Sequence, residues 1–428
     1  MRRIAAACLV GSAIEFYDFL IYGTAAALVF PAVFFPHRSP AIAAIASLGT
    51  FAAAFVSRPL GAAVFGYYGD RLGRKKTLIS TMLIMAVSTV GVGLVPTTAT
   101  IGVAAPMILI GLRLLQGFAV GGEWAGSTLL SAESAPPDKR GLYGMFTQLG
   151  GGTAAVLSCL TFLTVNVTIG ESSPAFLQWG WRVPFLISSL LIALALYVRL
   201  NIDETPVFAE EQARQVVPRA PLADLWRMQR REIVLAGGSA LGAMAFCYLA
   251  NTFLAMYAHN HLGYSRAFIW TVGAMGGVAS LMSVATSAML SDRVGRRRMM
   301  LLGWSLCVPW AFAVMPLVDS GSPACYAVAI VGMCGIAGIG SGPTAAFVPE
   351  LFAARYRYSG SALAVNIAGV FGSAMPPLIA GTLLVTYGSW AIGLMLAMLA
   401  AISLICTYLL PETVGRPLLP ADSAFSDA

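Results

Sequence analysis

Long apolar stretches separated by short polar breaks run along almost the whole 428-residue chain. Each stretch holds roughly 20 residues, the length at which a helix crosses the hydrocarbon core of a bilayer. Lipid offers the backbone no hydrogen-bond partners, so such spans are expected to be helical. We count twelve, with eleven as the alternative, and place them at residues 4–26, 41–65, 77–95, 101–125, 142–165, 182–200, 232–258, 268–290, 299–317, 324–346, 360–386 and 389–410.

The composition agrees with a protein embedded in lipid. Hydrophobic residues make up 58% of the chain and charged residues only 11%, well below the usual quarter for soluble domains. The net charge of +7 would suggest a nucleic-acid partner in a soluble protein, but here most Lys and Arg fall on one side of the predicted spans. By the positive-inside bias that side is cytoplasmic, so we expect a multi-pass plasma-membrane protein, bacterial in type, with both termini inside and no nucleic-acid partner.

The start of the chain resembles a signal peptide, with two arginines followed by an apolar run. Glu15 and Asp18 interrupt that run, so we interpret it as an uncleaved first span. The seven cysteines occur singly, without CxxC or nearby histidines, and indicate no metal or other cofactor. The sequence has no HExxH or GxSxG motif for an enzyme and no appended soluble domain for a sensor.

The two halves of the chain repeat each other. GDRLGRKK at 69–76 returns as SDRVGRRR at 291–298, and Glu133, seven residues before Arg140, returns as Glu350, seven residues before Arg357. Parallel six-helix repeats are one way in which transporters are built. We therefore predict an all-α integral membrane fold of twelve helices in two six-helix repeats, with a bundle at 1–200, a cytoplasmic linker at 201–231, a bundle at 232–411 and a short tail at 412–428.

The repeated loop places an acid where a helix end meets a tight turn, followed by basic residues. Asp70 could bind helix-end amides or an arginine of another helix, forming a latch that breaks when the halves move. The alternative is a solvated loop that obeys the charge bias. The predicted cytoplasmic gate consists of Asp70, Arg71, Arg74, Glu133, Arg140, Asp292, Arg293, Glu350 and Arg357.

This loop, repeated after spans two and eight, resembles the signature of the major facilitator superfamily. Four further segments resemble its metabolite:proton symporter family: GSAIEFYDFLIYG at 11–23, SRPLGAAVFGYYGDRLGRKK at 57–76, RLLQGFAVGGEWAGS at 113–127 and GWRVPFLIS at 180–188. In that family a tryptophan usually stands where this chain has Phe16. The resemblance implies a monomeric carrier that couples small metabolites, such as dicarboxylates, shikimate, proline or betaine, to protons.

Ionisable residues inside the membrane are costly and are therefore functional candidates. Glu15 and Asp18 lie three residues apart on one helical face, which Tyr22 continues. Two close carboxylates repel each other when both are charged, so one of them is a candidate for taking up a proton near neutral pH. We predict both as proton-coupling residues.

Span four carries Arg113, Gln116 and Glu123 on one face. Arg113 and Glu123 are about 15 Å apart along the helix, too far to neutralise one another. Arg113 therefore needs Glu15, Asp18 or a substrate carboxylate as its partner. The alternative is a permanent ion-pair network that only locks helices together. For Glu123, proton coupling and anchoring of loops through Arg71 or Arg140 both remain open.

In the second half the candidates are uncharged and could equally pack between helices. The full set of predicted substrate-binding residues is Arg113, Gln116, Tyr17, Tyr22, Tyr248, Asn251 and Asn366. From these features we expect proton-coupled uptake of a small carboxylate-bearing metabolite by alternating access. A proton-driven exporter and an uncoupled facilitator are the alternatives. Exporters of the superfamily usually carry a Gly-Pro pair in span five, which Gly150, Gly151 and Gly152 lack.

Overall fold

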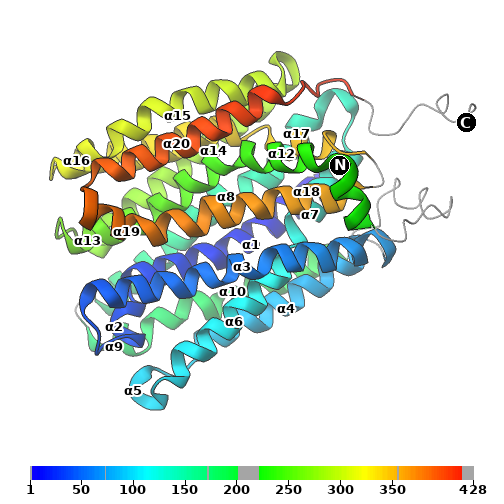
Figure 1. Cartoon of the computed structure of the whole chain (residues 1–428). Helices are drawn as coiled ribbons and strands as arrows, with labels where there is room; N and C mark the ends of the chain where they lie inside the picture. The colour runs from blue at the N-terminus through cyan, green and yellow to red at the C-terminus, as the bar shows by residue number, and fades with distance from the viewer. Residues whose placement is uncertain (1, 73, 171–172, 201–220, 354–355, 417–428) are drawn as a thin grey trace, which may run out of the picture.

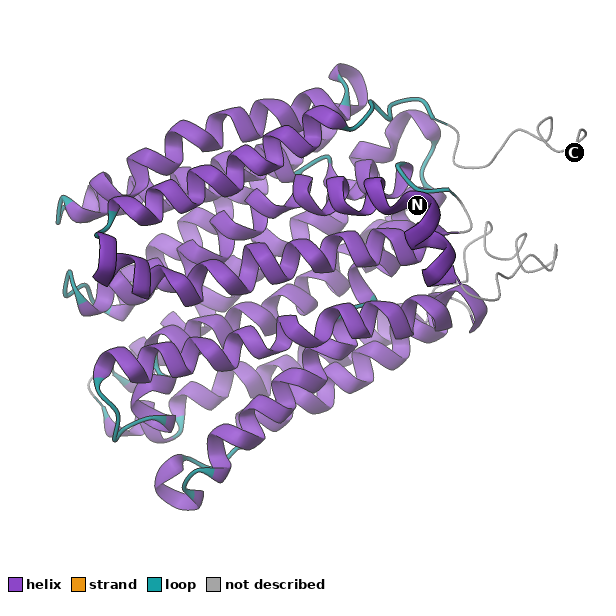
Figure 2. Ribbon diagram, viewed as in Figure 1, coloured by secondary structure: helices purple, strands orange, loops and turns teal. Residues whose placement is uncertain are grey.

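The structure is a computed structural model that describes residues 2–72, 74–170, 173–200, 221–353 and 356–416. Within these ranges every regular element is helical (Figure 2). Twelve helical segments are long and apolar enough to cross a membrane, so the prediction of twelve spans is confirmed.

The halves form two bundles that lie side by side (Figure 1). The N-terminal half contains α1 (Arg2–Leu28), α3 (Pro40–Leu72), α4 (Arg74–Leu94), α6 (Ala104–Val120), α7 (Glu123–Ser134), α8 (Arg140–Ile169) and α10 (Val183–Leu200). The C-terminal half contains α12 (Pro221–Asn251), α13 (Phe253–Asn260), α14 (Arg266–Val294), α15 (Arg296–Asp319), α16 (Pro323–Ser341), α17 (Thr344–Glu350), α18 (Arg357–Ala368), α19 (Met375–Tyr387) and α20 (Trp390–Leu409). Short helices α2 (Phe30–Phe34), α5 (Thr98–Ile101) and α9 (Pro174–Gln178) lie at the end opposite to the start of α1 and the end of α20 (Figure 1).

Four spans are interrupted rather than continuous. Span four breaks at Gly121 and Gly122, between α6 and α7, and therefore ends at Ser134 rather than near the predicted residue 125. Span seven breaks at Thr252, whose backbone angles (φ −119°, ψ −82°) leave the helical region. Span ten breaks at 342–343, and span eleven widens into a π-helical turn, η4 (Gly369–Ala374). Wide turns of this kind are frequent at functional sites.

Glycines bring helices into backbone contact. A Cβ atom at Gly117 of α6 would lie 1.8 Å from the carbonyl oxygen of Ala54 in α3. Between the halves, a Cβ atom on either Gly152 of α8 or Gly277 of α14 would lie 3.1 Å from the other's carbonyl oxygen. Close approach at small residues is how helices associate in lipid.

The end of the bundle where α1 begins and α20 ends carries Arg140, Arg296 and Arg297, and we call it the basic end (Figure 1). Residues 201–220 of the predicted linker and 417–428 of the predicted tail lie outside the described residues. Helix α12 already begins at Pro221, inside the predicted linker, and its regular path resumes after a kink at Gln229.

Candidate functional site

A cavity of about 120 Å³ lies between the two halves. It is lined in part by the rings of Phe16, Trp124 and Tyr248 and by the polar side chains of Gln148, Asn251, Ser280, Ser341 and Thr344. Among the described residues that line it, none is charged. A mostly apolar cavity with a few polar groups is typical of small-molecule sites.

Polar groups of this cavity connect the two halves. Trp124 donates from Nε1 to Oε1 of Gln148 over 3.2 Å, and Gln148 donates from Nε2 to the carbonyl oxygen of Ser341 in the other half over 2.9 Å. Asn251 donates to the carbonyl oxygen of Cys247 over 2.8 Å, which leaves its amide oxygen as an acceptor. The buried hydroxyl of Thr344 has no hydrogen-bond partner within the described part of the chain and could serve a bound solute.

Arg113 is fully buried inside the N-terminal half and does not line the cavity. Its guanidinium carbon lies 3.9 Å from the centre of the Tyr22 ring and 4.6 Å from that of Phe19. It donates to the side-chain oxygen of Gln116 and, over 3.4 Å, to the carbonyl oxygen of Phe51. Desolvated cation–π contacts of this kind stabilise a buried arginine.

A hydrogen-bonded chain links Arg113 to Asp18. Gln116 donates from Nε2 to the hydroxyl oxygen of Thr89 over 2.9 Å, and Thr89 donates to Oδ2 of Asp18 over 2.8 Å. Ser188 donates to the other carboxylate oxygen. Asp18 thus accepts from two hydroxyl groups, and the neutral side chains of Thr89 and Gln116 link it to Arg113 by hydrogen bonds.

A second buried pair lies closer to the cavity. Glu15 interacts electrostatically with Arg58 of α3, and both line a small cavity of about 10 Å³ together with Asn366. Phe16, Trp124, Met244 and Val365 line this small cavity as well as the central one. The guanidinium carbon of Arg58 lies 4.1 Å from the centre of the Phe19 ring, so Phe19 contacts both buried arginines.

Glu123 is fully buried at the start of α7, directly after the break in span four. It interacts electrostatically with Asp18. The carbonyl oxygens of the break are bound from the other half, because Asn366 donates to Gly121 over 2.7 Å and Tyr358 donates to Gly122 over 2.6 Å.

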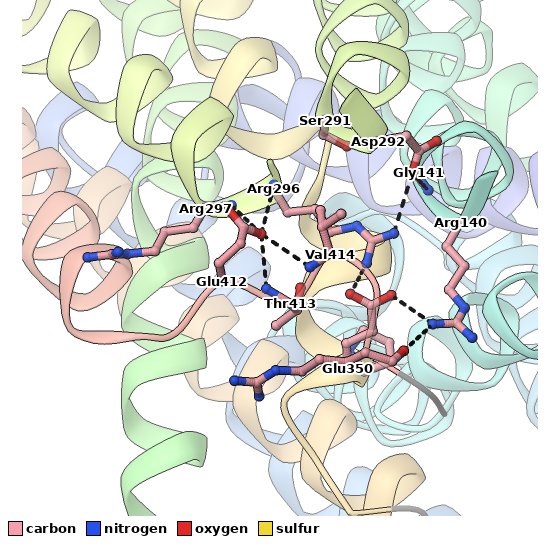
Figure 3. Close-up of polar contacts among 12 residues, drawn as sticks. Arg140, Gly141, Ser291, Asp292, Arg296, Arg297, Glu350, Glu412, Thr413 and Val414 are labelled. Atoms are coloured by element: carbon pink, nitrogen blue, oxygen red, sulfur yellow. Dashed lines mark hydrogen bonds and ion pairs between the residues drawn. The ribbon is translucent and has the colours of Figure 1, made fainter. Parts of the chain in front are cut away.

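An ionic network joins the two halves at the basic end (Figure 3). Glu350 of α17 pairs with Arg296 and, over 3.5 Å, with Arg140 of the other half. Asp292 accepts from the backbone amides of Gly141 and Leu142, over 2.8 Å and 2.9 Å, at the start of α8. A carboxylate at a helix N-terminus binds free amides and complements the helix dipole.

The segment after α20 completes this network. Glu412 accepts from the backbone amides of Arg296 over 3.0 Å and Arg297 over 3.2 Å, so it caps the start of α15 (Figure 3). Arg140 also donates to the carbonyl oxygen of Arg416 over 2.7 Å. Both halves and the segment after α20 are therefore tied together at the basic end.

The structure brings the predicted site residues together only in part. Tyr248 and Asn251 line the central cavity, and Asn366 lines the small one. The others lie inside the N-terminal half: Arg113 and Gln116 as above, Tyr17 with its hydroxyl 3.3 Å from the carbonyl oxygen of Pro184, and Tyr22 donating to Thr50 over 2.7 Å.

Two acids of the predicted gate, Glu350 and Asp292, have described arginine partners. The described partners of Glu350 are Arg140 and Arg296, whereas Arg357 donates to the carbonyl oxygen of Pro349 over 3.2 Å. Arg293 is exposed, and Arg296, the first residue of α15, pairs with Asp292 of α14 across the turn at Gly295. Glu133 is half-buried near the end of α7. Asp70, Arg71 and Arg74 lie outside the side chains that the structure describes, so their predicted role and any contact of Glu123 with Arg71 cannot be placed.

Sequence reasoning missed two arginines that the structure makes central. Arg58 stands alone inside an apolar span, which was itself a signal. Arg296 occupies the position that Arg74 holds in the first repeat, so the repeat could have identified it. The cavity residues Phe16, Trp124, Gln148, Ser280 and Thr344 carried no comparable signal, because uncharged residues in a span are more often packing residues.

Comparisons with known proteins agree with this architecture. The family model of the Major Facilitator Superfamily matches residues 8–377. The chain is 40% identical over 423 residues to the inner membrane metabolite transport protein YhjE of Escherichia coli K12, covering 97% of this chain and 96% of that protein. It is 35% identical over 393 residues to the shikimate transporter of the same organism, covering 91% and 89%.

Among solved structures, the proton:xylose symporter XylE bound to 6-bromo-6-deoxy-D-glucose superposes with a TM-score of 0.74 over 97% of both chains, at 18% identity. That identity establishes the likeness of fold alone. The predicted fold of two six-helix repeats and the resemblance drawn from the motifs are confirmed. The chain belongs to the major facilitator superfamily and is a membrane transporter.

Proposed function

We propose that this chain carries out proton-coupled uptake of a small carboxylate-bearing metabolite across a bacterial inner membrane. The observation that carries the proposal is the buried Glu15–Arg58 pair beside a neutral cavity between the halves. A carboxylate that can be neutralised next to a cation that can bind an anion is the minimum a proton–carboxylate symporter needs.

In this mechanism a proton binds Glu15 and removes its attraction for Arg58. The guanidinium of Arg58 then becomes available to a substrate carboxylate in the adjoining cavity, for which its planar fork is well suited. Loss of the proton restores the attraction and expels the anion. Substrate and proton therefore move together, because each makes the other's site favourable.

Asp18, Glu123, Arg113 and Gln116 form the supporting network in this proposal. Asp18 is the second candidate for proton binding, since its two hydroxyl donors can turn to accept from a protonated carboxyl. Arg113, enclosed by aromatic rings, holds the network positive and fixes the position of Phe19 between the two arginines.

The ionic network of Arg140, Asp292, Arg296 and Glu350 serves as the gate at the cytoplasmic face. Asp70, Arg71, Arg74 and Glu133 are the matching set from the first repeat, and we assign them the same role. The basic end faces the cytoplasm in this scheme because Lys and Arg accumulate on that side of membrane proteins. The carrier functions as a monomer.

A carboxylate substrate also fits the relatives. The shikimate transporter, which is similar over most of this chain, is named for a carboxylic acid. The polar groups on the cavity wall, Asn251, Gln148 and Thr344 among them, can bind hydroxyl or amino groups of such a metabolite.

The test is uptake into proteoliposomes of labelled organic acids, amino acids and betaines, with and without an inward proton gradient. We expect one carboxylate to accumulate only with the gradient. Arg58→Gln should abolish its binding, whereas the matched substitution Arg182→Gln, of an arginine at the opposite end that bonds the carbonyl oxygen of Val95, should not. Equilibration without accumulation would identify an uncoupled facilitator. Accumulation only when the vesicle interior is the more acidic side, so that protons leave as substrate enters, would identify a proton-driven exporter.

A further inference from the structure

The small cavity beside the central one is bounded by both halves of the transporter. Glu15 and Arg58 come from the N-terminal half, and Asn366 comes from span eleven of the other half. Its volume of about 10 Å³ is close to that of one water molecule. A Cβ atom at Gly369, in the π-helical turn that follows, would lie 3.4 Å from Nη1 of Arg58, so the guanidinium reaches span eleven.

The amide of Asn366 has a fixed orientation. Its nitrogen lies 2.7 Å from the carbonyl oxygen of Ala362 and 2.7 Å from that of Gly121. Both partners accept only, so the two N–H groups of the amide are used and the atom near them must be nitrogen. Asn366 lines the cavity of Glu15 and Arg58, and its amide oxygen is the atom that remains to accept a hydrogen bond there.

An acceptor discriminates between the two states of Glu15. It can accept directly from a protonated carboxyl, but it cannot bond directly to a carboxylate, because a carboxylate also only accepts. Hydrogen bonds in series polarise one another, so a donor to the amide oxygen strengthens the bonds that the amide nitrogen donates. One of these bonds, to Gly121, joins the halves at the break in span four.

We propose that Asn366 is the positioning residue that transmits the protonation of Glu15 to the contact between the halves, favouring closure of the basic end when Glu15 carries a proton. This rests on the proposed function and adds how the proton acts. The proton comes from and returns to water, and no other bond changes. The closed, protonated carrier then faces outward, ready for substrate.

Other charged groups around Glu15 act on the same equilibrium. Asp18 lies on its own helix, Arg58 on α3, Arg113 on α6, Glu123 on α7 and Tyr248 on α12. The carbonyl groups of the break in span four accept from Asn366 and Tyr358 instead. Tyr358 does not line the small cavity, which makes it a matched control.

The test is the distance between spin labels at Asp138→Cys and Arg298→Cys, exposed positions of opposite halves at the basic end, in nanodiscs from acidic to alkaline pH. The seven native cysteines are replaced first. In the labelled protein with Glu15 and Asn366 intact, we expect the distance to increase as pH rises, because the basic end opens. In Glu15→Gln the distance should stay short at every pH. Asn366→Leu should lose the pH response, while Tyr358→Phe should open somewhat at every pH and keep the response.

An unchanged pH response in Asn366→Leu and in the smaller variant Asn366→Ser would overturn this inference and leave the proposed function standing. A pH response that persists in Glu15→Gln would show that the proton binds another residue. It would overturn the role of Glu15 in this inference and in the proposed function. Two variants at Asn366 guard against misfolding of one, and size-exclusion profiles confirm that each is folded.

Discussion

The two halves of the transporter share one fold but bury different chemistry. In its described part, the N-terminal half buries five charged side chains away from the basic end, Glu15, Asp18, Arg58, Arg113 and Glu123, besides Arg140 at that end. In the described part of the C-terminal half, the buried charged residues Arg296, Glu350 and Arg357 all lie at the basic end. The two repeats thus share helix packing and charged residues at the basic end. They differ in the membrane interior, where the buried charges of the described residues lie in the N-terminal half.

The largest expected effect on stability comes from the packing of α6 against α3 in the N-terminal half. Gly117→Ala should lower the melting temperature strongly, because its Cβ atom would lie 1.8 Å from a backbone oxygen of α3 and neither helix can yield without moving Arg58 or Arg113. Thermal unfolding in detergent measures this effect.

Gly111→Ala, in the same helix, is the matched control, since nothing lies within 4 Å of its Cβ position. It should be neutral or slightly stabilising, by up to about 1 kcal/mol, because alanine is the better helix former. Equal stability of the two variants would contradict the described contact of α3 with α6.

A somewhat smaller effect is expected at the gate. Glu350→Ala removes the carboxylate that Arg140 and Arg296 share and leaves Arg296 with Asp292 alone, and breaking a buried ion pair in this way costs about 3–5 kcal/mol. The basic end should open, which alkylation of a cysteine placed at Gly144, on the face of α8 near Ala345, would detect.

The same substitution at the matching position of the first repeat sharpens the comparison. Glu133 is only half-buried, so Glu133→Ala should cost less than Glu350→Ala and open the gate less. Identical effects would mean that the two repeats contribute equally to the gate.

The smallest effect on transport is expected from the polar cavity residues of the C-terminal half. Asn251→Ala and Thr344→Val should raise KM by about two- to twelvefold, because each removes a polar group from the cavity and such hydrogen bonds are worth about 0.5–1.5 kcal/mol. The dependence of uptake on the proton gradient should not change. A loss of that dependence in either variant would show that proton coupling is not confined to the N-terminal half.

The sequence was sufficient for the fold because spans, charge bias and repeat are local or periodic features. Through the repeat it also singled out Asp292, Arg140 and Glu350, which the structure brings into one network at the basic end. It did not show which arginines they contact, because the pairing of Glu350 with Arg140 across the halves depends on tertiary arrangement. The same limit applies to Arg113, which was expected in the cavity but packs behind Phe19 and Tyr22.

The most direct test of the account is the ratio of protons to substrate moved, measured with a pH-sensitive dye trapped in proteoliposomes together with labelled substrate. The account predicts a fixed ratio in the unaltered protein and in Asn251→Ala, and substrate movement without protons in Glu15→Gln. Proton movement that survives Glu15→Gln but is lost in Asn251→Ala would contradict the assignment of coupling to the N-terminal half.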